Sequence, residues 1–221
     1  MVELFRTFYR TRQASSVVEF ALLVPLFLVL LLGSMEFNRY FRYARHLELS
    51  VDMVAHMTSQ RNSPIGPTDL NFDLNASEFV FRELASEEPV SVAWWRKLGH
   101  QITHVVFTPT VAGCTTSCTY EANVAWSWPD YKIKLGSLSR ACGKLQPAGD
   151  GVAPNGSTLP AKMFGPGSLI VVDLTFDYKP VFGAGLVPPF RMVRQAYYAP
   201  RFATPYLPAL NGPSITRCPG F

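Results

Sequence analysis

The chain has 221 residues, of which 48% are hydrophobic, and its formal net charge is +4 at pH 7. The positive charges are spread along the sequence without a dense basic stripe, and no nucleic-acid-binding motif accompanies them, so a nucleic-acid partner is not expected. About 160 residues follow Arg61, which is enough for one domain with a modest core.

An apolar segment over residues 15–35 has the length of a membrane span. At about 1.5 Å of rise per residue, a helix of this length crosses a hydrocarbon core of about 30 Å. Pro25 lies within the segment, and transmembrane helices tolerate proline. We therefore predict a single transmembrane helix in contact with membrane lipid. A cleaved secretory signal is the competing interpretation, but no small-x-small cleavage site follows the apolar core.

Glu19 is a carboxylate near the start of this apolar segment. A charge at the centre of a membrane helix costs about 2.5–3.5 kcal/mol on insertion scales, and a charge near the end costs less. One interpretation is that Glu19 pairs with a positive group inside a helical bundle. The other is that it reaches the cytoplasmic interface beside Arg12.

The helical pattern continues beyond the apolar segment, through residues 36–61. Apolar residues recur at spacings of three and four, and neither Gly nor Pro occurs between Ser34 and Ser63. One helix is therefore predicted from about Ser15 to about Arg61, packing its stripe against a domain outside the membrane. The stripe comprises Phe37, Tyr40, Phe41, Ala44, Leu47, Val51, Val54 and Ala55.

The N-terminal part of the chain resembles the TadE-like pilus assembly proteins, which are minor pilins or pseudopilins of the tight-adherence (Flp-type) secretion system. The resemblance covers residues 6–57, and beyond them it is loose, limited to a late strand ending at Tyr178-Lys179-Pro180 and an arginine-containing strand after it. It is carried by the following motifs: Arg10-Thr11-Arg12, Ala14-Ser15-Ser16, Val18-Glu19-Phe20-Ala21, a Leu-rich span with Pro25, and Glu36-Phe37-Asn38-Arg39.

The resemblance implies processing by a prepilin peptidase on the cytoplasmic side, between Ala14 and Ser15. Glu19 would then be the fifth residue of the mature chain, and Ala14 stands where the family usually has Gly. Glu19 and Phe20 are implied in assembly, with the Glu19 carboxylate offset by the new amino group at Ser15 of a neighbouring subunit. The implied partners are the peptidase, other pilins and inner-membrane components of the pilus machine.

The cysteines indicate on which side of the membrane the domain lies. All four follow the apolar segment, and an even count in a small domain fits an oxidising compartment. We therefore expect a cytoplasmic basic leader over 1–14, a span over 15–35 in the inner membrane, and a periplasmic C-terminal domain that the family also carries into extracellular pili. Four cysteines allow three connectivities, and we expect Cys114 with Cys118 and Cys142 with Cys218.

The domain over 62–221 is predicted to be α+β and pilin-like, with mainly antiparallel strands packed against the long helix. Residues 62–68 are expected to form a linker, 75–85 a short helix, and 146–167 a long surface loop. Clusters of β-branched and aromatic residues predict four strands, the first two forming a hairpin: 102–110, 120–128, 168–178 and 190–199.

Other sequence patterns that resemble sites are better explained structurally. Cys114 and Cys118 lack the second pair of ligands that a zinc site needs, and His100 and His104 lack the glutamate of a zinc peptidase. Asp69 to Asn75 begins like a calcium loop but has neither the Gly at its sixth position nor the Glu at its twelfth. With no hydrolase or phosphate-loop motif either, we expect no catalytic residue, metal, cofactor or small-molecule substrate.

Three hypotheses for the function follow. The first is a non-enzymatic minor pilin that primes or tips a pilus by packing its helix against those of other pilins. The second is an unprocessed, membrane-anchored scaffold or adaptor of the same apparatus. The third, an envelope enzyme, has no catalytic constellation to support it.

Overall fold

The structure is a computed structural model that describes residues 12–61, 65–81, 98–128, 135–153, 155–182, 185, 187–201 and 215–221, with the backbone alone for residues 12–16 and Glu78. The predicted leader over 1–14 lies almost entirely outside these residues. The chain divides into two compact units. The first comprises residues 1–42 and 179–189, and the second comprises residues 43–178 and 190–221.

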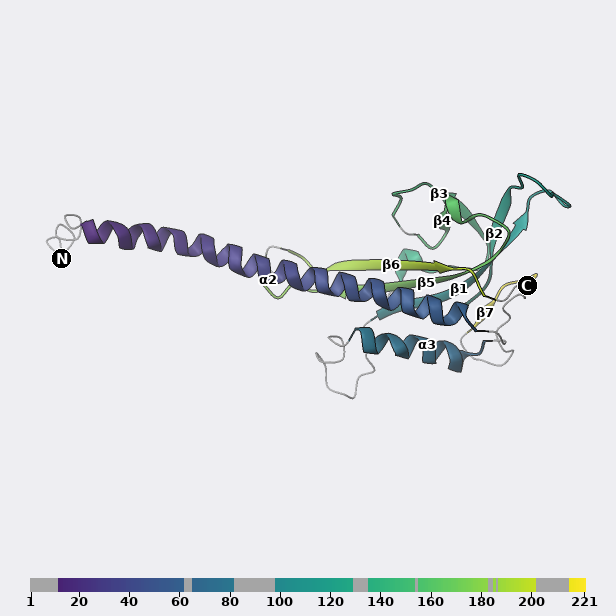
Figure 1. The fold of residues 1–221 in the computed structure, drawn as a ribbon, viewed down its shortest axis with the longest axis horizontal. Coiled ribbons are helices and arrows are strands. Elements are labelled where there is room, and N and C mark those ends of the chain that lie inside the picture. Colours follow the sequence, from purple (N-terminus) through teal and green to yellow (C-terminus); the bar gives the residue numbers. More distant parts are fainter. Residues whose placement is uncertain are drawn as a thin grey trace. The chain divides into compact units, whose positions relative to one another are not determined.

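Helix α2 (Arg12–Ser59) contains 48 residues and includes Pro25 without ending there (Figure 1). In the second unit it buries side chains three or four residues apart, namely Tyr43, Ala44, Leu47, Val51, Val54 and Ala55. In the first unit Phe37 and Phe41, which the pattern placed on the same stripe, are exposed and contact each other edge to face. Within the second unit, the stripe packs on the domain from Ala44 onward, together with Tyr43.

Helix α3 (Pro67–Val80) begins eight residues before the position predicted from the sequence. Pro67 occupies the first turn, where its missing N–H is not needed, and the Asp69 carboxylate accepts the Gly66 N–H at 2.9 Å. The predicted linker is therefore wrong from Pro67 onward, and Asp69 caps this helix. The predicted end at Ala85 lies outside the described residues.

In the described part of the chain, seven strands form a sheet in the order β4-β3-β2-β1-β5-β6, with β7 beside β2. The antiparallel strands predicted from β-branched and aromatic clusters are present as β1 (Leu98–Pro109), β2 (Tyr120–Trp128), β5 (Gly167–Tyr178) and β6 (Phe190–Tyr198). The α+β class with a long N-terminal helix is confirmed. The shorter strands are β3 (Lys144–Ala148), β4 (Thr158–Pro160) and β7 (Thr216–Arg217).

One face of the sheet packs on α2 and α3. The Tyr43 ring stacks on the Phe176 ring, with ring centroids 5.5 Å apart. Phe81, after the end of α3, contacts the Phe176 ring edge to face at 5.6 Å. Antiparallel pairing places alternate residues of neighbouring strands on one face, so Ile102, opposite Val172, also faces the helices. Aromatic and aliphatic burial on this face fixes α2 to the domain.

The other face is covered by the segment that was predicted to be a surface loop. Instead of a loop throughout, 146–167 contains β4, most of β3 and a 3-10 turn (Ala161–Met163), and β3 and β4 pair in parallel. Its side chains join a second core, made of Val105, Phe107, Ala122, Val124, Leu145, Leu159, Leu169, Val171 and Cys218. The prediction failed because long-range burial, not local propensity, orders this Gly- and Pro-rich segment.

Candidate functional site

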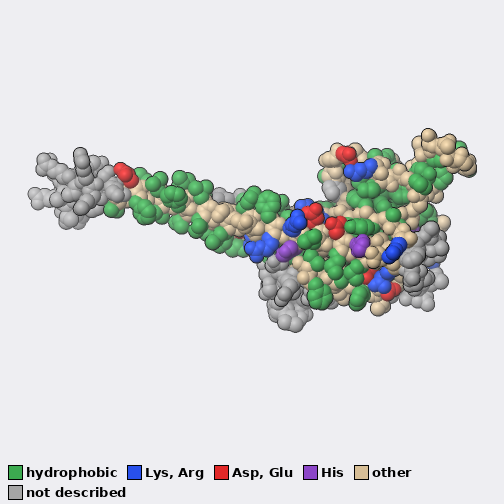
Figure 2. Space-filling model, viewed as in Figure 1, with side chains coloured by type: hydrophobic (Ala, Val, Ile, Leu, Met, Phe, Trp, Pro, Cys, Tyr) green, Lys and Arg blue, Asp and Glu red, His purple; other side chains and the backbone are tan. Residues whose placement is uncertain are grey.

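The first half of α2 presents apolar side chains on all sides. From Val17 to Met35 every residue is exposed except Val24, which is partly buried, and Figure 2 shows hydrophobic side chains along this segment. Leu22 is 74% exposed and Val29 is 69% exposed. A helix that is apolar all round needs an apolar surrounding. Among the described residues this is the one helix long and apolar enough to cross a membrane, which is compatible with a single-pass membrane protein.

Two carboxylates bracket the uncharged part of this helix. No Asp, Glu, Lys or Arg lies between Glu19 and Glu36, which are about 25 Å apart along the axis at 1.5 Å per residue. That distance is slightly less than the hydrocarbon core of about 30 Å. Glu19 and Phe20 are exposed, and Ala14 and Ser15 lie in the first turn of α2.

Glu36 joins the end of the apolar segment to a distant part of the chain within the first unit. Its Oε2 accepts the backbone N–H groups of Val181 and Phe182 at 3.2 Å and 3.1 Å. These residues belong to the β5–β6 loop, residues 179–189. One carboxylate oxygen thus holds two successive amides, a charge-assisted arrangement that fixes the loop beside the helix. No pattern in the sequence indicated this contact.

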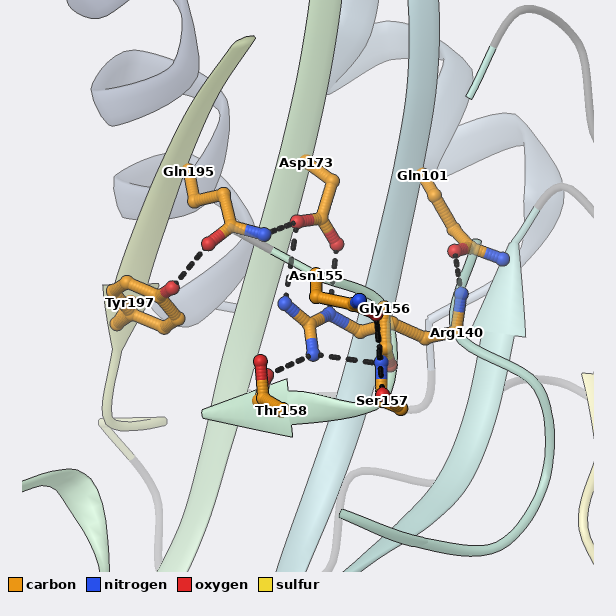
Figure 3. Close-up of polar contacts among 9 residues, drawn as sticks. All are labelled: Gln101, Arg140, Asn155, Gly156, Ser157, Thr158, Asp173, Gln195 and Tyr197. Carbon is orange, nitrogen blue, oxygen red and sulfur yellow. Dashed lines mark hydrogen bonds and ion pairs between the residues drawn. The ribbon is translucent and has the colours of Figure 1, made fainter. Parts of the chain in front are cut away.

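Arg140 organises a buried polar network on the sheet face opposite α2 (Figure 3). Its guanidinium bonds both oxygens of Asp173, with Nε–Oδ2 at 2.8 Å, and both side chains are fully buried. Nη1 donates to the carbonyls of Thr158 and Gly156, and the Arg140 N–H donates to Gln101 Oε1 at 2.7 Å. Because its carbonyl contacts lie in the 155–158 segment, Arg140 ties that segment to the sheet.

The network continues across the sheet to β6. Gln195 donates from its side-chain amide to Asp173, and the Tyr197 hydroxyl donates to Gln195. Burial raises the pKa of Tyr197 to about 12, with the nearby Arg140 charge acting in the opposite direction. Every oxygen of the Asp173 carboxylate is engaged by these donors, so the cluster is a structural tie between layers.

His100 and His104 lie on the sheet face that packs on the helices, on either side of Ile102 in β1. Both are buried, and burial lowers the pKa of each to about 4. The His100 ring lies against Trp128, and the His104 ring lies against Trp126, with centroids 5.7 Å and 5.8 Å apart. Neither ring nitrogen of His104 has a hydrogen-bond partner among the described residues. The pair is a neutral part of the core, as expected of a structural role.

The residues that resembled metal ligands are engaged by other groups. Asp73 is fully buried and accepts bonds from Arg61 Nη2 at 2.6 Å and from the Thr58 hydroxyl at 3.1 Å. Cys114 and Cys118 form a disulfide, as do Cys142 and Cys218. Within the described residues, no group of three or more potential metal ligands is present.

Neither the buried pairing of Arg140 nor the loop contact of Glu36 was predicted, and only the first of these left a signal in the sequence. Asp173 is a lone carboxylate within the apolar strand Leu169-Ile-Val-Val-Asp173-Leu, and a buried charge requires a partner. The sequence of that strand therefore indicated that a cation elsewhere in the chain pairs with Asp173, although it did not identify Arg140. Glu36 lies on a helix with other charged residues, so its charge does not by itself indicate a partner elsewhere in the chain.

The N-terminal part of the chain is similar to a known protein family. The family model described as TadE-like protein matches residues 14–56, which include the exposed apolar segment, Glu19 and Glu36. No curated protein and no solved structure matched the chain. The match ends within the part of α2 that packs on the domain. Residues 14–56, which make up most of α2, are thus similar to TadE-like proteins, a finding consistent with a protein of the tight-adherence pilus system.

Proposed function

We propose that this protein is a minor pilin or pseudopilin that takes part in the assembly, priming or tip formation of a tight-adherence pilus. The observation that carries the proposal is the division of α2. One continuous helix has an apolar half exposed on all sides and a second half that is part of a domain core. Such a helix can pass from lipid into a bundle of similar helices while its domain stays folded.

Glu19 supplies the specific contact in this proposal. A carboxylate within an apolar helix is costly in hydrocarbon, and a positive group from a neighbouring helix would lower that cost. Cleavage between Ala14 and Ser15 would create such a group, the new amino terminus. Phe20, beside Glu19 and 66% exposed, would pack in the same contact. No catalytic role is included in the proposal.

The proposed location is the inner membrane, with residues 1–14 in the cytoplasm and the domain in the periplasm. Two disulfides support this orientation, because disulfides persist in oxidising compartments. In assembled pili the domain would be extracellular. The proposed partners are therefore membrane lipid, a prepilin peptidase, other pilins and the inner-membrane parts of the pilus machine.

The mature N-terminus tests this proposal. Protein extracted from its native membrane is analysed by mass spectrometry, in strains with and without the prepilin peptidase. The expected N-terminus is Ser15 in the first strain and Met1 or Val2 in the second. An uncleaved chain in both strains would contradict a processed pilin. Sheared pili from the same strains are then tested for the chain with an antibody to the domain.

An unprocessed scaffold of the same apparatus is the second candidate. It is favoured by Ala14, which stands where the family usually has Gly before the cut. A scaffold would keep its leader, stay in the membrane fraction and be missing from sheared pili. The two measurements therefore separate the candidates.

A further inference from the structure

We propose that the β5–β6 loop, described at residues 179–182, 185 and 187–189, is a second membrane contact, with Val181, Phe182 and Val187 inserted into the lipid interface next to the transmembrane part of α2. The inference rests on the proposed membrane span and adds a partner for this loop. It starts from the contact in which Glu36 holds the N–H groups of Val181 and Phe182 at 3.2 Å and 3.1 Å.

The position of Glu36 sets the depth of the loop. Glu36 follows the last residue of the apolar segment, Met35, and a carboxylate at this position belongs at the boundary between hydrocarbon and headgroups. The loop is in the same compact unit as this part of the helix. A loop fixed to Glu36 therefore lies at the level of the interface, at the end of the span opposite Glu19.

The described apolar side chains of the loop are exposed, as a segment at the lipid interface requires. Val181 is 59% exposed, Phe182 is 42% exposed and Val187 is 47% exposed. Met35 and Phe37, on either side of Glu36 in the sequence of α2, are also exposed, at 53% and 62%. The same carboxylate that binds the loop satisfies two backbone N–H groups, which would otherwise be costly to bring near hydrocarbon.

The positive charges near the loop are typical of residues at a lipid–water interface. Lys179, at the start of the loop, and Arg42, on the helix, are both exposed. Cations near the surface are attracted to anionic headgroups. An apolar tip with flanking cations is therefore matched to anionic lipid, and lipid is the occupant that we propose.

A depth measurement on the full-length chain tests the proposal. Phe182→Cys, Val152→Cys and Leu26→Cys each introduce one thiol for an environment-sensitive fluorophore, because the four native cysteines are in disulfides. Labelled proteins are reconstituted in phosphatidylethanolamine–phosphatidylglycerol vesicles that contain lipids spin-labelled at a shallow or a deep position. Val152 is the matched control, an apolar residue 60% exposed in the second unit.

We expect the fluorophore at 182 to show blue-shifted emission and strong quenching by the shallow label, with neither effect at 152. Equal, weak quenching at 182 and 152 would overturn the loop proposal. The fluorophore at 26 separates this failure from failure of the span, because it reports quenching by the deep label only if α2 crosses the bilayer. Protection of position 182 in assembled pili but not in vesicles would assign the loop to a neighbouring subunit and also overturn the proposal.

The role of Glu36 is tested in the same vesicles. Glu36→Ala removes the acceptor and is expected to reduce shallow quenching at 182, whereas Glu36→Gln keeps a side-chain oxygen and should retain most of it. Quenching at 182 that is unaffected by Glu36→Ala would overturn the assignment of Glu36 as the group that holds the loop.

Discussion

The Arg140 guanidinium and the Asp173 carboxylate form an ion pair in the interior of the domain, with Nε and Oδ2 at 2.8 Å and both side chains fully buried. Arg140 precedes the first β3 residue by four positions, and Asp173 lies in the middle of β5. Arg140 also donates to the Gly156 and Thr158 carbonyls, so the pair joins the segment 146–167, the covering layer on the face opposite α2, to the central sheet. Since both charges have left water, each depends on the other for compensation.

Removal of one charge from this pair is predicted to destabilise the domain. Asp173→Asn leaves Arg140 buried without a counter-charge, and such losses cost about 3–5 kcal/mol. Denaturant unfolding of the detergent-solubilised chain measures the change. Asp150→Asn is the control, because the Lys162–Asp150 pair is largely exposed and its loss should cost less than about 1 kcal/mol. Equal effects of the two substitutions would contradict a structural role for the buried pair.

Gly156 is predicted to be the least replaceable glycine of the covering layer. A Cβ at this position would lie 2.4 Å from the Ser139 carbonyl oxygen and 2.7 Å from that of Leu138, and both are backbone atoms that a rotamer change cannot move. Gly156→Ala should therefore destabilise the domain by about 1–3 kcal/mol, the usual cost of overpacking. At Gly149 a Cβ meets nothing within 4 Å. Gly149→Ala is the control, and thermal unfolding should separate the two variants.

The Cys142–Cys218 disulfide is predicted to contribute more stability than the Cys114–Cys118 disulfide. The first joins residues 76 positions apart and the second joins residues 4 apart. In the chain-entropy model a loop of that greater length is worth on the order of 4 kcal/mol, about twice the value of the short one. Cys218 is buried in the second core, so Cys142→Ser is combined with Cys218→Ala to avoid burying a hydroxyl group.

Thermal unfolding of this double variant is compared with that of Cys114→Ser/Cys118→Ser. A larger loss of stability is expected when the long loop is opened. Peptide mapping without reduction verifies the remaining bridge in each variant. Mapping that joins Cys114 to Cys142 or Cys218 in the wild-type chain would contradict both pairs.

The buried histidines predict a loss of stability in mild acid. Burial lowers the pKa of His100 and His104 to about 4, against about 6.5 in an unfolded chain. Between these values the unfolded state binds more protons, so stability is fully present above about pH 6.5 and falls as the pH decreases toward 4. His104→Leu should flatten this slope and stay within about 1.5 kcal/mol of wild type at pH 7. Denaturant unfolding from pH 4 to pH 8 measures both effects.

The sequence predicted the elements whose periodicity is long and regular. The stripe of α2 and the β-branched runs of β1, β2, β5 and β6 were recognised because local pattern and burial agree there. Helix α3 was placed too late because Pro67 and Asp69, its actual start signals, were interpreted as linker. The covering layer was missed because its order depends on contacts with distant residues, above all those of Arg140 and Cys142.

The candidate site was predictable only in part, for a related reason. Glu19 stands out because a charge within an apolar helix violates the pattern around it. The contact of Glu36 with Val181 joins residues that are 145 positions apart, and nothing in either local sequence requires it. A single chain read without its fold thus reveals local exceptions more readily than distant pairings.

Glu19 is predicted to act in assembly and not in membrane insertion. Glu19→Ala removes a charge from the apolar segment, so insertion should be unchanged or improved, whereas a contact with the amino group of a neighbouring subunit is lost. Resistance to carbonate extraction measures insertion, and electron microscopy with immunoblots of sheared pili measures assembly. Val18→Ala is the matched control, a substitution at the adjacent exposed helical position. Normal piliation by the Glu19→Ala strain would exclude the pairing role and favour a carboxylate that simply reaches the cytoplasmic interface.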